Sequence, residues 1–214
     1  TVYFNNGGRL VSTGELSLET GVATTVGGDP TTTSLDLGEG AIIAQGITIN
    51  NRNPELDAAD ADLADDYVTV SGGALAVASR LATSNNEIKF NDASLVLDSN
   101  GFTRYGLSAT EGGAVSAAKL TFSGDGSTFE VVTGDWTVGA NGKLGDVDVI
   151  ESGNVVIGAD AGEFIRNNIG ASLQIDNLSL AGTPTCASNL EVKDGGELTV
   201  NTIQAANTSL SVTG

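Results

Sequence analysis

The amino-acid sequence predicts an all-β fold, a parallel β-helix (β-solenoid) that forms a single domain over residues 1–214 with a short helical insertion near residues 53–66. Three observations predict it. Short segments of alternating apolar and polar residues recur along the chain, 29 glycines against 3 prolines mark many tight turns, and a strand–Gly-Gly–strand phrase returns with variations. Alternation directs every second side chain to one face of a strand, and repetition of such a unit is typical of stacked β-coils.

The repeated phrase is clearest at residues 68–77, VTVSGGALAV, and at residues 190–200, LEVKDGGELTV. Leu75, Val115 and Leu198 follow its turns at equivalent positions, which favours stacked coils over a meander of hairpins, a sandwich or a barrel. With about 20–25 residues per coil, we expect roughly nine rungs.

The alternation predicts short strands that are bounded by Gly, Asn, Asp, Ser and Thr. In chain order they are Leu16–Leu18, Ser34–Leu37, Ile42–Ile49, Tyr67–Val70, Leu75–Val77, Glu87–Phe90, Ser94–Leu97, Ala114–Phe122, Thr128–Val132, Trp136–Val138, Val147–Ile150, Val155–Ile157, Ser172–Ile175, Leu178–Leu180, Leu190–Val192, Leu198–Ile203 and Ser209–Val212. Because aromatic residues make up only 5% of the chain, we expect a narrow core of Val, Ile, Leu and Ala.

The segment at residues 53–66 breaks the alternation and predicts a helix. Asn53 suits the N-cap and Pro54 the first helical position. Leu56 and Leu63 lie on one apolar stripe at helical spacing. We expect this helix to pack against the side of the coils, with the covering of one end as the alternative.

The composition excludes several classes of function. With 27 acidic and 9 basic residues, the net charge of −18 repels nucleic acids and anionic membrane surfaces. No histidine is present, which excludes Ser–His–Asp and Cys–His catalysis and imidazole-based zinc or copper sites. The single cysteine, Cys186, has no partner for an internal disulfide. We therefore assign no catalytic, cofactor-binding or metal-ligating residue and expect no cofactor.

Carboxylates are the remaining candidates for chemistry. Asp146 and Asp148 lie two residues apart on a predicted strand, and Lys143 and Glu151 are nearby. Both aspartates would point to one face, as the paired acids of a glycosidase or the acidic cluster of a lyase require. A solvated outer face explains the same pattern.

A second acidic group lies in the predicted helix. Asp57, Asp60, Asp62, Asp65 and Asp66 suggest calcium, but carboxylates on a helix diverge, and calcium needs six to eight converging oxygens. An exposed helix face is the simpler interpretation.

Aromatic side chains and strand edges are the other candidates for contacts. Trp136 and Phe129 are the best candidates for a glycan platform, although packing in the core explains them better. Thr1–Phe4 and Leu210–Val212 would place open strand edges at the two ends of the stack. Either the stack continues in residues outside this sequence, or these edges pair with neighbouring subunits.

The phrases at residues 68–77 and 190–200 resemble the coils of autotransporter passengers and related bacterial surface adhesins. The resemblance implies a right-handed parallel β-helix, export, a rod-like scaffold and binding by loops or faces. It implies no catalytic residues, and the insertion at residues 53–66 departs from it.

These observations predict a non-enzymatic, extracellular or surface-exposed structural or adhesive β-solenoid module. The alternatives are a viral capsid-decoration or tail-fibre protein and a carbohydrate-active β-helix enzyme that uses Asp146 and Asp148. The expected partner is a protein or glycan surface, or further copies bound through exposed strand edges, without nucleic acid or a membrane span. Contacts are expected at residues 53–66, Asn100–Tyr105 and Gly182–Asn189.

Overall fold

The computed structural model describes fourteen β-strands whose pairings are all parallel. The predicted all-β class with parallel strands is therefore confirmed. The described residues are 4, 7–20, 34–51, 67–99, 102–109, 112–124, 126–139, 145–158, 170–193 and 195–213. The predicted helix at residues 53–66, with its five aspartates, lies outside them, and the only helical element inside them is one 3₁₀ turn, η2 (Thr103–Tyr105).

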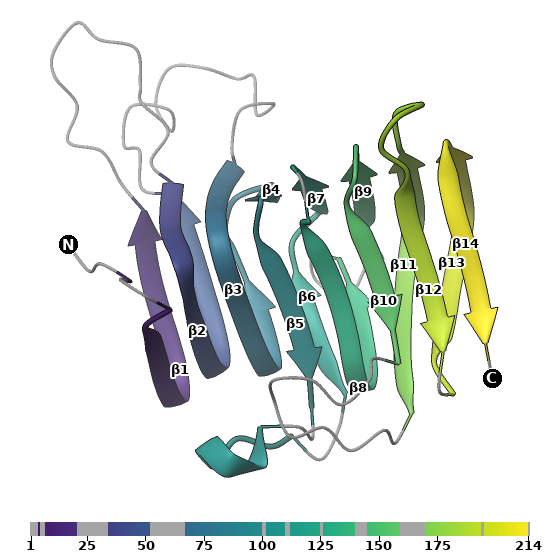
Figure 1. Cartoon of the computed structure of the whole chain (residues 1–214). Coiled ribbons are helices and arrows are strands. Elements are labelled where there is room, and N and C mark those ends of the chain that lie inside the picture. The colour runs from purple at the N-terminus through teal and green to yellow at the C-terminus, as the bar shows by residue number, and fades with distance from the viewer. Residues whose placement is uncertain are drawn as a thin grey trace, which may run out of the picture.

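The strands extend from β1 at one end of the structure to β14 at the other (Figure 1). Their bounds are β1 (Arg9–Thr20), β2 (Ser34–Asn51), β3 (Tyr67–Ala82), β4 (Glu87–Asn91), β5 (Ser94–Asp98), β6 (Gly113–Ser116), β7 (Lys119–Ser123), β8 (Thr128–Val138), β9 (Asp146–Ile150), β10 (Asn154–Ile157), β11 (Ala171–Ala181), β12 (Ser188–Lys193), β13 (Glu197–Ala206) and β14 (Thr208–Thr213).

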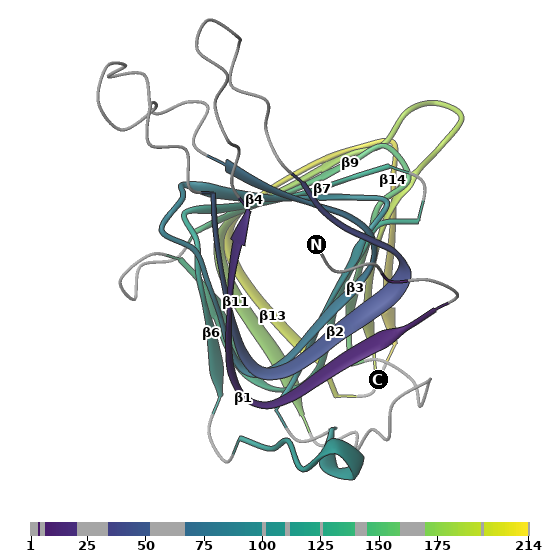
Figure 2. The ribbon, with the colours of Figure 1, turned by 90° about the vertical axis from the view of Figure 1, so that its left-hand side faces the viewer.

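The strands enclose an elongated interior on three sides (Figure 2). Face A contains parts of β1, β2, β3 and β8 together with β5, β10, β12 and β14. Face B contains other parts of β1, β2, β3 and β8, with β6 and the first parts of β11 and β13. Face C contains the first parts of β2 and β3, then β4, β7, β9 and the last parts of β11 and β13.

The long strands bend at the corners and so pair on two faces. The pairings β3–β4–β7–β9–β11–β8–β5 return to β3 and close a ring of seven parallel strands. Each face is nevertheless a series of strands in continuous register, eight of them on face A (β1, β2, β3, β5, β8, β10, β12, β14).

The register aligns inward-facing apolar residues in columns. One column on face A is Leu10, Ile42, Leu75, Leu95, Phe129, Val155, Leu190 and Leu210. One column on face C is Val68, Ile88, Leu120, Val147, Leu178 and Ile203. Away from the two ends these residues are buried, and the core is mainly aliphatic, as the composition predicts.

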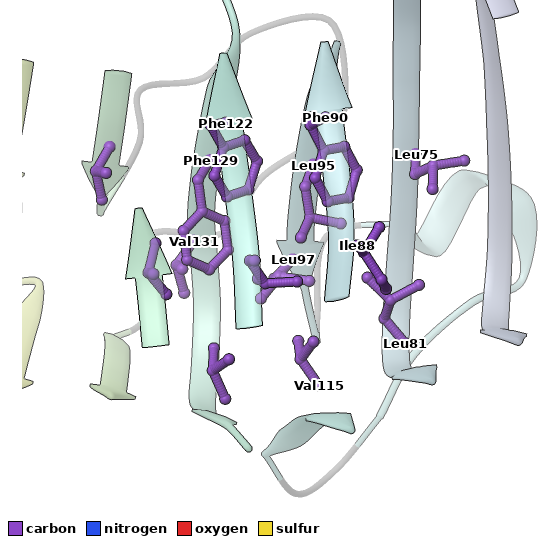
Figure 3. Packing of buried hydrophobic residues seen from close by; sticks show 14 of the residues in the cluster. Leu75, Leu81, Ile88, Phe90, Leu95, Leu97, Val115, Phe122, Phe129 and Val131 are labelled. Atoms are coloured by element: carbon purple, nitrogen blue, oxygen red, sulfur yellow. The ribbon is translucent and has the colours of Figure 1, made fainter. Parts of the chain in front are cut away.

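Three phenylalanines of the core form one short stack across the interior (Figure 3). The ring of Phe122 lies 4.8 Å from that of Phe90 and 5.2 Å from that of Phe129, with interplanar angles of 8° and 9°. Trp136 is also buried and donates a hydrogen bond from Nε1 to the carbonyl of Thr133 at 2.9 Å.

The glycine phrases lie at corners, but not at equivalent ones. Gly73, with a φ of +59°, lies between faces C and A, whereas the corresponding turn at Gly195 lies between faces A and B. Leu75, Val115 and Leu198 consequently belong to three different columns, so their predicted equivalence is wrong. The physical reason is that corners of both kinds can use a residue with a positive φ, as at Gly73 and Gly195, and glycine is suited to either.

The predicted strands agree with the observed ones, with two differences. The predicted single strand Ala114–Phe122 is two strands, because the chain leaves β6 after Ser116 and moves from face B to face C before β7. The first half of β1 was not predicted, because the sequence RLVST does not alternate regularly.

Candidate binding groove

The outer surface of face A changes from apolar to polar along the stack. One outward-facing column consists of Val11, Ile43, Ala76, Val96, Glu130, Val156, Glu191 and Ser211. The neighbouring column consists of Arg9, Ala41, Ala74, Ser94, Thr128, Asn154, Asn189 and Ser209. An apolar outer surface requires a cover, and a polar one does not.

The cover is the loop formed by residues 102–109. Phe102 and Leu107 are fully buried and form a second hydrophobic cluster with outward-facing side chains of face A, including Ile43 and Val132. Gln45 donates a hydrogen bond from Nε2 to the carbonyl of Ser108 at 3.2 Å, which ties the loop to β2. The described part of the predicted Asn100–Tyr105 contact is therefore partly packed against the protein itself.

Beyond this loop, face A is hollowed into an open groove of about 420 Å³. It crosses β8, β10, β12 and β14, and its lining residues are Thr128, Asn154, Val155, Val156, Asn189, Leu190, Glu191, Ser209 and Ser211. Asn189 donates a hydrogen bond from Nδ2 to Oδ1 of Asn154 at 2.8 Å, so two amides of adjacent strands are held in line. On β12, Nζ of Lys193 lies 3.5 Å from Oε2 of Glu191.

The chemistry of the groove is that of neutral hydrogen bonding. Amides and hydroxyls both donate and accept, which matches the hydroxyl groups of a sugar or the backbone of an extended peptide. Glu191 adds one acceptor, and Val156 adds a small apolar surface. The groove can therefore orient a polar, uncharged ligand along the direction of the stack.

The predicted carboxylate pair lies elsewhere, on the outer surface of face C. Asp146 and Asp148 both face outward from β9, as the alternation predicts. Lys119 binds Oδ2 of Asp148 at 2.7 Å, and Asn177 donates a hydrogen bond from Nδ2 to Oδ1 of Asp146 at 2.8 Å. Lys143 lies outside the described residues; among those described, Lys119 of the adjacent strand β7 is the cation that contacts Asp148.

Lys119 lies at the centre of an ion-pair cluster. Its Nζ also lies 4.0 Å from Oε1 of Glu87 on β4. Partial burial lowers the pKa of Lys119, but the hydrogen bond and charge of Asp148, together with the charges of Glu87 and Asp146, outweigh burial and raise that pKa above 10.5. The cluster places cations and anions on neighbouring strands, which stabilises a sheet.

Of the other predicted candidates, the Gly182–Asn189 segment reaches the groove through its last residue, Asn189. Trp136 and Phe129 are fully buried, which confirms that they pack in the core. Cys186 is exposed in the turn that precedes β12, where its backbone N–H bonds the hydroxyl of Thr183 at 3.0 Å. That turn and Asn189 are the exposed parts of the predicted Gly182–Asn189 contact.

The sequence did not identify the groove. Its residues are spread over four strands, at 128, 154–156, 189–191, 209 and 211, and ordinary surface residues look the same in sequence. The groove can be recognised only after the register is known, because the outward columns of face A then show where apolar residues are replaced by Asn, Ser and Thr.

Within the described residues, no three or more acidic or cysteine side chains gather as a metal site would require. Those residues also contain no helix with the length and apolar character to cross a membrane. No family model, curated protein or solved structure matches this chain.

Proposed function

We propose that the chain is a β-solenoid module of an extracellular or cell-surface protein, with a structural and adhesive rather than an enzymatic role. Its stacked strands serve as a stiff scaffold, and the groove on face A binds a glycan of a partner surface. The observation that carries the proposal is the change of face A from an apolar surface under the 102–109 loop to an open, hydrogen-bonding groove.

The solenoid interpretation rests on the order of the faces along the chain. From β2 onward the chain passes face C, face A and face B in the same order, and each visit pairs with the previous visit to that face. The ring of seven strands arises because β3, β8 and β11 continue around a corner without a break. In such a stack each coil contacts mainly the coils directly before and after it, which makes the stack stiff and allows it to be extended by further coils.

The adhesive role rests on the groove and on the state of the acidic residues. Asp146 and Asp148 are held by Lys119 and Asn177, which favours a structural role for this pair over a catalytic one. The groove, in contrast, is lined mainly by amides and hydroxyls on four adjoining strands, β8, β10, β12 and β14. The net charge of −18 favours an uncharged or cationic partner over an anionic one.

The experiment is a glycan-binding measurement on the whole chain, first on an array of neutral oligosaccharides and then by calorimetry with the best ligand. In the double variant Asn154→Ala/Asn189→Ala, we expect affinity to fall about tenfold or more, since two hydrogen-bonding groups of about 1 kcal/mol each are removed. Asn91→Ala is the matched control, because Asn91 is exposed on face C.

Equal binding by the double variant and the control would remove the groove from the proposal. Release of reducing or unsaturated ends from a polysaccharide, lost in Asp146→Asn/Asp148→Asn, would instead support the enzyme alternative.

A further inference from the structure

The groove on face A presents hydrogen-bonding groups at a regular interval along the stack. In one outward column β8, β10, β12 and β14 contribute one amide or hydroxyl each, from Thr128, Asn154, Asn189 and Ser209. Because paired strands lie about 4.8 Å apart, these groups recur at that interval and at right angles to the strands. The groove is therefore a straight track along the stack, with one polar group for each strand that it crosses.

The groups of this column are held in place by contacts within the protein. Nδ2 of Asn189 donates a hydrogen bond to Oδ1 of Asn154 at 2.8 Å, and Oγ1 of Thr128 donates one to the carbonyl of Gly126 at 3.3 Å. An amide has two N–H donors and an oxygen that accepts twice, and a hydroxyl that donates can still accept. The groups are therefore ordered and still able to bind a ligand, which lowers the entropic cost of binding.

A second outward column forms the other side of the track. Val156, Glu191 and Ser211 lie two residues further along β10, β12 and β14, which separates the two columns by about 6.6 Å. Val156 lines the groove and also packs against the second hydrophobic cluster under the 102–109 loop. The track thus offers polar groups on both sides and an apolar contact at Val156, as the hydroxyls and the C–H face of a sugar ring require.

The spacing of the track distinguishes a glycan from a peptide. An extended peptide advances about 3.3 Å per residue and repeats the same face every 6.6 Å or so, which falls out of step with strands about 4.8 Å apart. In a β-(1→4)-linked chain of hexopyranoses the equatorial linkages keep the chain extended, and each ring advances it by nearly one strand spacing. An α-(1→4)-linked chain curves and would leave a straight track.

We propose that the ligand of the groove is a linear, uncharged β-(1→4)-linked glycan, which lies along the stack with one ring at each strand. This inference rests on the glycan-binding role proposed above and names the class of glycan. Uronic acids are disfavoured by Glu191 in the groove and by the net charge of −18. A coil added beyond β14 would lengthen the two columns and leave them uncovered, because coils add at the strand edge and the columns lie on the outer surface.

The test is calorimetry of the whole chain with two β-(1→4)-linked series, cello-oligosaccharides and chito-oligosaccharides, and with α-(1→4)-linked malto-oligosaccharides, each of two to six rings. For at least one β-linked series we expect affinity to rise about fivefold with each ring from two to four, since each ring adds at least one hydrogen bond. Beyond four rings it should change little, because the groove crosses four strands. The α-linked chain of four rings should bind about tenfold more weakly or worse, since it loses two or more of these contacts.

The variant Ser209→Ala removes the polar group at one end of the track. We expect the affinity for four rings to fall about fivefold, to that for three rings, while the affinity for two rings is unchanged, because two rings can still bind at Asn154 and Asn189. Asn91→Ala, at an exposed residue of face C, is the control and should leave all lengths unaffected.

The outcomes separate this inference from the proposed function. Equal affinity for α-linked and β-linked chains of four rings, or an affinity that does not grow with length, would overturn the inference while the groove still bound a glycan. Failure to bind any oligosaccharide of the array would overturn the proposed function as well. Tighter binding of an uncharged octapeptide of alternating serine and glycine than of every glycan would assign the groove to a peptide and overturn both.

Discussion

Phe122 links two faces of the core, and its removal should be among the most damaging single changes. Its ring is fully buried and stacks on Phe90 of the adjacent strand β4 and on Phe129 of β8. Truncation of a buried phenylalanine to alanine costs about 3–5 kcal/mol. Each stacked pair adds about 0.5–1.5 kcal/mol beyond the buried area, so the loss of two pairs places Phe122→Ala near the upper part of that range.

The assay is urea unfolding at low protein concentration, followed by far-ultraviolet circular dichroism and by the fluorescence of the buried Trp136. We expect Phe122→Ala to lower the free energy of unfolding by about 4–5 kcal/mol. Val212→Ala, at a side chain that is 81% exposed, should change it by less than about 0.5 kcal/mol. A loss below about 1.5 kcal/mol in Phe122→Ala would refute a close-packed aromatic stack at this position.

Three further predictions concern a corner, an ion-pair cluster and the loop on face A. Gly73→Ala should destabilise the protein by more than Gly126→Ala: both glycines have a positive φ, but a Cβ at Gly73 would lie 2.2 Å from the carbonyl oxygen of Gly40 while one at Gly126 would meet nothing within 4 Å. Urea unfolding of the two variants measures the difference, and equal losses would contradict the tight corner. The raised pKa of Lys119 stabilises the fold fully at pH values below about 10.5, and this stabilisation is lost as the pH rises through the higher pKa of the folded state. The difference in stability between the unmodified chain and Lys119→Gln should hence be constant near neutral pH and shrink in alkali; a difference that grows in alkali would contradict it. Phe102→Ala should cost about 3 kcal/mol or more and speed limited proteolysis of the 102–109 loop, because Phe102 anchors the second hydrophobic cluster. Unchanged proteolysis would show that the loop is held by other contacts.

The sequence predicted the strands well because alternation is a local property. Nearly every predicted segment, such as Glu87–Phe90 and Ser94–Leu97, falls inside an observed strand. The narrow aliphatic core and the outward direction of Asp146 and Asp148 also followed from composition and from period-two alternation.

The pairing register between strands could not be predicted from local sequence patterns. Loops of unequal length separate successive visits to one face, so Leu75 pairs with Leu95 and Leu95 with Phe129, at quite different sequence spacings. The Gly-Gly phrases did not identify which residues pair, because glycine is suited to more than one kind of corner. The groove and the role of Lys119 as the partner of Asp148 depend on that register, and therefore neither was predicted.

The central claim is that successive visits to a face stack in parallel register, and one distance tests it directly. On face C the register aligns Thr69, Lys89, Thr121, Asp148, Ser179 and Gln204 in one outward column. Five strand spacings of about 4.8 Å separate the two ends of this column by about 24 Å. Spin labels on Thr69→Cys and Gln204→Cys, in a Cys186→Ser background, report that distance by electron-electron resonance. A single narrow distribution near 24 Å, after allowance for the label arms, is the predicted result. A broad distribution, or one centred beyond about 35 Å, would contradict the stacked register.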